Sequence, residues 1–264
     1  MADFSAKDVK RLRDQTGAGM MDAKKALVET DGDFEAAAKW LREKGLASAG
    51  KRADRESSQG AVALARAGNV AALVELRCET DFVAKSPDFV SLANDLAQLV
   101  ADEGEVALDS RKDDVDSLKI TLKENIGLGR VVRFEVAEGN LLDTYLHVQS
   151  GRGVNAVLIE LAGGDQELAH DIAVHAAFAK PQYLTRDEAP EETVAEERST
   201  FEAQARNSGK PEAALAKISE GMLTGWFKER VLLDQPFAKD DKQSVQQVLG
   251  DARVVRFAQV VIGA

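Results

Sequence analysis

Two histidines and the single cysteine are the side chains that could serve a metal site or act as a nucleophile. His170 and His175 lie five positions apart in a helix-like run, which separates two helical side chains by roughly 140°. Ligands on different faces do not converge on one metal ion, so a core or surface histidine is the favoured interpretation of each. Cys78 ends an apolar run with no histidine nearby in the sequence, which favours inert packing. We therefore predict no metal site.

Glycine patterns that resemble nucleotide-binding loops occur twice, and both are incomplete. Residues 127–129 begin a dinucleotide pattern, but its third glycine position holds Val132. Lys210 follows a glycine as in a phosphate loop, yet Pro211 stands where Ser or Thr is needed. Carboxylates are abundant, but nothing marks any pair as catalytic. The sequence therefore predicts neither an enzyme nor a cofactor.

One short stretch holds a large apolar side chain where a polar connection is expected. The strand-like run from Val70 to Leu76 and the helix-like run that follows both have the composition of a core. Between them Phe82 directly follows Asp81, although surface loops are normally polar. A phenylalanine that packs its own loop is one interpretation, and an anchor that enters an apolar crevice on another protein is the other. The residue types alone leave both open.

The composition is that of an ordinary globular protein with an acidic balance. Of the 264 residues, 44% are apolar, and 34 Lys and Arg against 45 Asp and Glu give a net charge of −11. This disfavours a nucleic-acid backbone as the main partner, although a local basic patch stays open. A single cysteine excludes an intrachain disulfide and fits a reducing compartment. Without a signal-peptide pattern or a membrane-length apolar run, we expect a soluble, cytoplasmic protein.

Apolar spacing over residues 5–45 predicts three short helices. Residues 17–19 separate the first from the second, residues 31–33 separate the second from the third, and Gly45 is expected to close the third. A bundle of about forty residues is small for independent stability, so recognition suits it better than catalysis. The stretch of mixed charge at 51–60 is expected to be a linker.

The middle of the chain repeats itself. Residues 68–76 resemble residues 153–161, and each run is preceded by a strand-like segment and followed by a helix-like one. Residues 131–134 are likewise repeated at 254–257, in two further strand-like segments. The first copy carries about six extra residues between strand and helix, and these include Phe82. We therefore predict an α+β core with an internal pseudo-repeat, to which the Phe82 loop is an addition.

Composition shifts again between Pro190 and about Arg230. Two charged helices with thin apolar stripes are predicted here, joined by a strong turn at 207–211. Narrow stripes on two helices across a short turn are typical of an antiparallel hairpin. We expect this hairpin to project from the body of the protein.

Two stretches resemble one known family. The run VKRLRDQTGAGMMDAKKAL, from Val9 to Leu27, is similar to the opening of bacterial elongation factor Ts. The run CETDFVAK, from Cys78 to Lys85, is similar to the signature of that family in the same relative position. Supporting similarities are GKP at 209–211, EG at 220–221 and LLDQPF at 232–237. The helical opening alone would suit any ubiquitin-associated (UBA) bundle, but both motifs in this order are specific.

The resemblance implies a guanine nucleotide exchange factor for elongation factor Tu, with no chemistry, cofactor, nucleic-acid contact or membrane contact of its own. It implies that a loop enters the nucleotide-binding domain of the partner and disturbs its magnesium and phosphate sites. The implied modules are a UBA-like three-helix bundle that docks on the partner (1–50), two subdomains of an α+β core (51–140 and 141–189), a coiled-coil hairpin (190–231), and a C-terminal module that returns to the core (232–264).

Position by position, the resemblance assigns residues to partner contact in four places: Arg13, Met20 and Met21 in the bundle, Thr80, Asp81, Phe82 and Val83 in the exchange loop, His147, and Val245 and Leu249 in a C-terminal helix. Residues 148–155, after His147, depart from the Gly-rich pattern of the family. A core position is an equally good interpretation of one of the two methionines. An adaptor without exchange activity is an alternative that intact Asp81 and Phe82 disfavour, and no residue pattern favours an enzyme with an unrecognised site.

Overall fold

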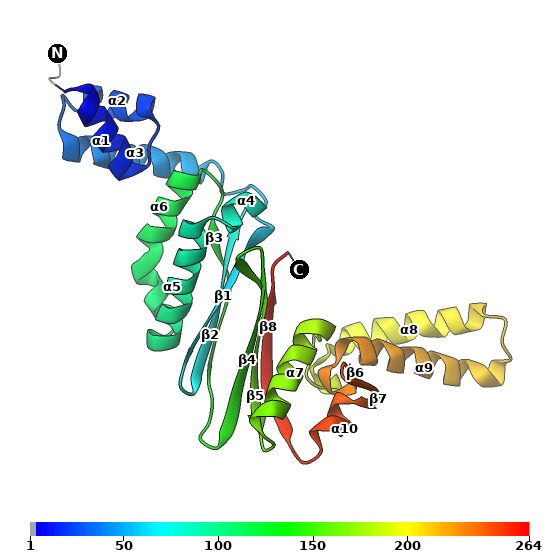
Figure 1. The fold of residues 1–264 in the computed structure, drawn as a ribbon. Coiled ribbons are helices and arrows are strands. Elements are labelled where there is room, and N and C mark those ends of the chain that lie inside the picture. The colour runs from blue at the N-terminus through cyan, green and yellow to red at the C-terminus, as the bar shows by residue number, and fades with distance from the viewer. Residues whose placement is uncertain (1–3, 264) are drawn as a thin grey trace.

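The computed structural model describes residues 4–263 as an N-terminal helical bundle, a core of two small sheets flanked by helices, and a pair of long helices that extends from this core (Figure 1). The expected mixed α+β class is confirmed. Among the described residues, no helix combines the length and the apolar composition needed to cross a membrane.

The bundle consists of α1 (Ala6–Thr16), α2 (Met20–Glu29) and α3 (Phe34–Gly50). Ser5 and Asp8 cap α1 reciprocally, because Ser5 Oγ accepts from the Asp8 N–H at 3.3 Å and the Asp8 carboxylate accepts from the Ser5 N–H at 2.8 Å. Gly17 ends the helix in the left-handed region, at φ +67°. The inward faces of the three helices form a small core made of Val9, Leu12, Ala23, Ala26, Leu27, Ala37 and Leu41.

The third helix does not end at Gly45, as the sequence predicted, but continues to Gly50. Gly45 lies where α3 packs on α6 (Lys112–Leu122), and a Cβ there would lie 2.7 Å from Cγ2 of Ile120. The glycine therefore permits close approach of two helices, although it costs about 1 kcal/mol relative to alanine in a helix interior. From the sequence alone, a glycine at this position fits both the end of a helix and a site where two helices pack closely.

Two antiparallel three-stranded sheets form the core, in the orders β1-β2-β3 and β4-β5-β8. Their strands are β1 (Gln59–Ala67), β2 (Val70–Cys78), β3 (Gly127–Glu135), β4 (Asn140–Gln149), β5 (Arg152–Ala162) and β8 (Arg253–Val261). Helix α5 (Pro87–Glu103) and α6 lie on the outside of the first sheet, and α7 (Gln166–Ala179) lies on the outside of the second (Figure 1). Val62, Leu73 and Leu158 belong to the apolar cluster that joins the sheets. The core is thus layered helix–sheet–sheet–helix.

Each half of the core has the same order of a β-hairpin, a helix, and a third strand that returns to the second strand. Strand β3 pairs with β2 as β8 pairs with β5, which agrees with the sequence repeat of residues 131–134 at 254–257. The halves differ in the connection between strand and helix. Residues 79–86 join β2 to α5, whereas residues 163–165 join β5 to α7.

The long helices α8 (Glu191–Asn207) and α9 (Glu212–Arg230) lie side by side and reach away from the second half (Figure 1). Leu223, Trp226 and Phe227 are buried at their base. The remaining short elements are η1 (Glu105–Arg111), η2 (Arg186–Glu188), η3 (Leu232–Asp234), β6 (Pro236–Phe237), β7 (Asp240–Ser244) and α10 (Val245–Leu249). Apolar side chains of η3, β6 and α10 join the cluster beneath α7.

Candidate functional site

The connection between β2 and α5 contains α4 (Asp81–Ala84), a single helical turn that holds Phe82 out in solvent. The side chain of Phe82 is 82% exposed, whereas Ala84 is buried and Val83 packs against the first core cluster. This exposure contradicts the interpretation of Phe82 as a side chain that packs its own loop. An aromatic ring with so little contact to its own chain is available to another molecule.

Two carboxylates brace the start of this turn. Glu124 Oε2 accepts from the backbone N–H groups of Glu79 at 2.9 Å and Thr80 at 3.1 Å, and its Oε1 accepts from the Thr80 hydroxyl at 2.5 Å. In the reverse direction, Glu79 Oε1 accepts from the Asn125 N–H at 2.7 Å. The Thr80 hydroxyl also accepts from the Val83 N–H at 3.3 Å, which caps α4. We refer to Glu79, Thr80, Glu124 and Asn125 as the clasp.

Glu124 and Asn125 belong to this site although no pattern in the sequence points to them. Glu124 lies 45 positions from Glu79 in the chain, and its type and neighbours are ordinary for a residue that follows a helix. Lys123, at φ +59°, caps the end of α6 and turns the chain toward the β2–α5 connection. No local pattern carries that signal, because the two segments meet only after the first half has folded.

Asp81 is held by an ion pair with Lys85 across one turn of helix. A hydrogen bond from Lys85 lowers the pKa of the Asp81 carboxyl group, against the opposing effect of desolvation. Asp81 is therefore an anion at neutral pH, directly beside the exposed ring. The pair leaves the carboxylate partly exposed, so it stays within reach of a partner.

Cys78 and Arg152 lie beneath the loop. The Cys78 thiol donates to the Thr80 carbonyl at 3.2 Å, and burial raises its pKa to about 12, so it is a packed thiol rather than a nucleophile. Arg152, at the start of β5, is buried and donates to the carbonyl of Gly60 and to Gln59 Oε1. These bonds tie the hairpin of the second half to the first half at the same end of the core as α4.

The predicted bundle contacts are all exposed. Met20 and Met21, in the first turn of α2, are 46% and 76% exposed, so neither belongs to the core of the bundle. The alternative in which one methionine packs inside is therefore wrong. Arg13 is exposed on α1, with Asp14 3.6 Å away as its ion-pair partner. Their contact with a partner remains a prediction.

His147 is exposed near the end of β4, next to exposed Val148. Its ring stacks on Tyr145 with 6.4 Å between centroids, and Tyr145 Oη lies 3.3 Å from His147 Nδ1. The unusual segment after it forms a tight hairpin turn in which Ser150 and Gly151 have φ of +54° and +81°. The β4–β5 pairing continues through this segment to Gln149 and Arg152, but its register shifts between His147 and Val148, where the atypical sequence begins.

The prediction that Val245 and Leu249 contact a partner is contradicted by burial. Both side chains of α10 lie inside the cluster formed with α7, with almost no exposed surface. Ser244 and Gln247 cap this short helix reciprocally, which fixes its apolar side inward. An amphipathic turn in a sequence does not say whether its apolar side meets its own core or another protein.

The two histidines of α7 have separate surroundings, as their spacing predicts. His170 Nδ1 lies 3.0 Å from Asp143 Oδ2 near the surface. His175 is buried, where its Nδ1 accepts from the Ala238 N–H at 3.1 Å and its Nε2 donates to Gln235 Oε1 at 3.0 Å. Burial lowers the pKa of His175, so it is neutral at pH 7. Across residues 4–263, no group of three His, Cys, Asp or Glu side chains could hold a metal ion.

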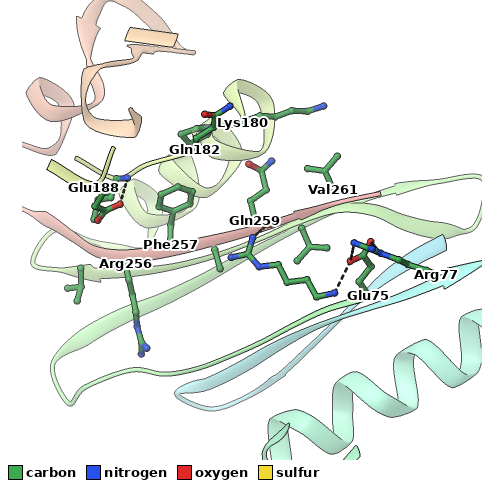
Figure 2. Close-up of a pocket in the computed structure, with 15 residues that line it drawn as sticks. Glu75, Arg77, Lys180, Gln182, Glu188, Arg256, Phe257, Gln259 and Val261 are labelled. Atoms are coloured by element: carbon green, nitrogen blue, oxygen red, sulfur yellow. Dashed lines mark hydrogen bonds and ion pairs between the residues drawn. The ribbon is translucent and has the colours of Figure 1, made fainter. Parts of the chain in front are cut away.

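A groove lies between the open edges of the two sheets, lined by residues of β2, β3, β8 and the segment after α7 (Figure 2). Buried Glu75 accepts from Arg77 Nε at 2.8 Å and from the Arg130 N–H at 2.8 Å. A Cβ on Gly129 would lie 2.2 Å from Glu75 Oε2. That glycine makes room for a carboxylate inside a strand and is not part of a dinucleotide loop. None of the predicted partner contacts lines this groove.

The fold and the site define an α+β protein in which a braced helical turn holds one aromatic ring, Phe82, out in solvent beside an anion, an arrangement suited to protein contact. A family model described as Elongation factor TS matches residues 79–264. Over the whole chain, elongation factor Ts of Acidothermus cellulolyticus is 49% identical and that of Micrococcus luteus 43%, with 99% and 100% of those proteins covered. The chain therefore belongs to the elongation factor Ts family.

Proposed function

We propose that this chain promotes the release of GDP from elongation factor Tu, so that the GTP form can be regenerated. Membership of the elongation factor Ts family supports the proposal, since nucleotide exchange on elongation factor Tu is the known role of that family. The observation that carries it is the exposure of Phe82 on α4. What sets Phe82 apart from the other exposed apolar side chain of its type, Phe178, is its place on a braced turn beside the Asp81 carboxylate, where a ring can serve as an anchor in a pocket of a partner.

Exchange needs no catalytic chemistry from this chain. A factor that binds the nucleotide-free partner more tightly than the nucleotide-bound partner must, by linkage, weaken nucleotide binding by the same factor. In the proposed mechanism Phe82 enters an apolar crevice of the nucleotide-binding domain, and its insertion disturbs the magnesium and phosphate sites of the partner. Asp81 supplies the adjacent anion, Thr80 caps the turn, and Val83 anchors it to the core.

The other contacts divide between docking and support. Arg13, Met20 and Met21 are exposed on the bundle and are proposed to dock the chain on the same domain of the partner. His147, exposed on β4, is proposed as a contact from the second half of the core. Val245 and Leu249 have no place in this proposal because they are buried.

We also propose that the five segments 1–50, 51–140, 141–189, 190–231 and 232–264 are separate modules working together in the cytoplasm. The bundle is proposed to be UBA-like. The α8–α9 pair is proposed to pack as a coiled coil, and the ion pair between Arg198 and Glu220, at 2.9 Å, supports it. Elongation factor Tu is the proposed protein partner, with no nucleic acid or membrane involved.

Release of fluorescently labelled GDP from elongation factor Tu tests this function. We expect the full chain, added at increasing concentration, to accelerate release in a saturable manner. The matched control is Lys228→Ala, an exposed substitution near the end of α9 that lies outside the proposed contacts. A release rate equal to spontaneous dissociation at every concentration would refute the proposal.

A further inference from the structure

The exchange loop depends on groups outside itself for its direction. Helix α4 is one turn long, and so short a helix is not stable by itself in water. Phe82 cannot orient the turn because it is exposed, and the Asp81–Lys85 pair lies within the same turn. The restraints that reach the turn from outside it include the packing of Val83 and Ala84 on the core, the Cys78 thiol on the Thr80 carbonyl, and the cap at Thr80.

The cap is itself held by Glu124. Its carboxylate accepts three hydrogen bonds from residues 79 and 80. The Thr80 hydroxyl that it holds in turn accepts from the Val83 N–H, so Glu124 also restrains the orientation of α4. Hydrogen bonds to a charged acceptor are stronger than those between neutral groups. Glu124 therefore restrains the first turn of α4 without touching Phe82.

The same point fastens the linker that leads from the bundle. Asn125 Nδ2 donates to the carbonyls of Ala53 at 3.0 Å and Arg55 at 2.7 Å, and the Asn125 carbonyl accepts from Ser57 Oγ at 2.9 Å. Arg52 adds a bond to the Lys119 carbonyl at 3.1 Å. The linker, the end of α6 and the exchange loop therefore meet at Glu124 and Asn125.

We propose that Glu124 is a positioning residue for exchange, which holds α4, and with it Phe82, in a fixed direction relative to the bundle. The functional part of this inference rests on the proposed exchange activity. A fixed direction matters because two contact sites on one chain must match two sites on the partner at the same time. The clasp fixes the position of Phe82 relative to the bundle before the partner binds.

The structural part is tested by a distance measurement on the full chain. Spin labels are attached at Met21→Cys and Phe82→Cys, while native Cys78 is protected by its burial and its raised pKa. We expect a narrow distribution of distances in the parent. Glu124→Ala should broaden it, and Glu124→Gln, whose amide can still accept and donate at the same place, should largely preserve it.

The matched control is Glu138→Ala, which removes an exposed carboxylate in the turn after β3. Equal widths for Glu124→Ala and Glu138→Ala would overturn the proposal. If Glu124→Ala does not fold, Thr80→Val deletes only the hydroxyl link between Glu124 and α4. Broadening is expected in that variant also, and an unchanged width there would equally overturn the proposal.

The functional part is tested by GDP release with unlabelled variants. Glu124→Ala should lower the rate at saturation about tenfold, as expected for loss of charged hydrogen bonds. The concentration for half-saturation should change by less than about threefold, because docking by the bundle is separate. Adding Glu124→Ala to Phe82→Ala should cause no further loss, since Glu124 acts through Phe82.

Additive losses in that pair would show that Glu124 acts elsewhere and would overturn its positioning role. Restoration of the rate by Glu124→Gln but not by Glu124→Met supports the role, because methionine supplies similar bulk without an oxygen that accepts hydrogen bonds. If the unmodified chain fails to accelerate GDP release, the proposed exchange function falls. The distance distributions then still decide whether Glu124 holds the loop.

Discussion

The two halves of the core use one architecture and differ in the connection from the central strand to the outer helix. In the second half, residues 163–165 make the connection with Gly163 and Gly164 at φ of +76° and +74°, and Asp165 caps α7 by accepting from the Leu168 N–H at 2.9 Å. In the first half, residues 79–86 make it with no residue at positive φ and with a helical turn of their own.

The comparison shows which part of the first-half connection is needed for packing and which part is an addition. The second half shows that hairpin, helix and third strand close with a three-residue turn. The longer loop of the first half is therefore not needed to close the same unit. It is free to present Phe82, at the cost of needing Glu124 and Glu79 to hold it.

The largest expected effect on stability comes from the helix that follows that loop, α5. Phe89 is fully buried on α5, seven positions after Phe82. We expect Phe89→Ala to lower the free energy of unfolding by about 3–5 kcal/mol, because it leaves a cavity in the first core. Urea denaturation measures this loss. A change of less than about 1 kcal/mol would mean that α5 does not pack as described.

Phe82→Ala should show the opposite behaviour in the same assays. The free energy of unfolding should change by about 1 kcal/mol or less, as at other surface positions. Stimulated GDP release should fall more than about tenfold, because truncation of an interface anchor commonly costs at least about 2 kcal/mol. Unfolding and release are measured on one preparation. The reverse order, with lost stability and normal release, would restore the loop-packing interpretation.

Substitutions that strain the backbone should destabilise the short connection at 163–165, whereas the long connection at 79–86 has no residue at positive φ to strain. A Cβ on Gly164 would lie 2.9 Å from Leu168 Cδ2, in addition to requiring positive φ. Gly164→Ala is expected to lower the free energy of unfolding by about 1–3 kcal/mol. Gly139→Ala, also at positive φ but with open space around it, isolates the cost of φ alone. Equal losses in the two variants would show that contact with Leu168 contributes nothing.

The smallest expected effect is a pH dependence of stability caused by His175 in the second half. Burial lowers the pKa of His175 below its ordinary value of 6.5, so below that pH the unfolded chain holds more protons than the folded chain. Stability should therefore fall as pH decreases through 6.5, by at most about 1.4 kcal/mol per pH unit for one proton. Urea midpoints measured across this range should depend less on pH in His175→Gln. An identical dependence in both proteins would exclude His175 as the cause.

Local patterns in the sequence predicted much of this molecule. The helices of the bundle, the α8–α9 hairpin and the repeated β2 and β5 segments were recognisable because spacing and turn residues act between near neighbours. The incomplete glycine patterns and the divergent faces of His170 and His175 were likewise local features. The motif around Phe82 was recognised by resemblance, and the residue types had left its exposure open.

Contacts between distant segments could not be predicted in the same way. The close contact at Gly45 depends on Ile120 of another helix, and the burial of Val245 depends on the position of α7. The bonds from Glu124 to residues 79 and 80 cross 45 positions or nearly so. The sequence by itself determined the elements and where the loop was inserted. Only the tertiary structure decided which side chains the loop leaves exposed and which groups hold it, because those depend on surfaces that exist only when both halves have packed.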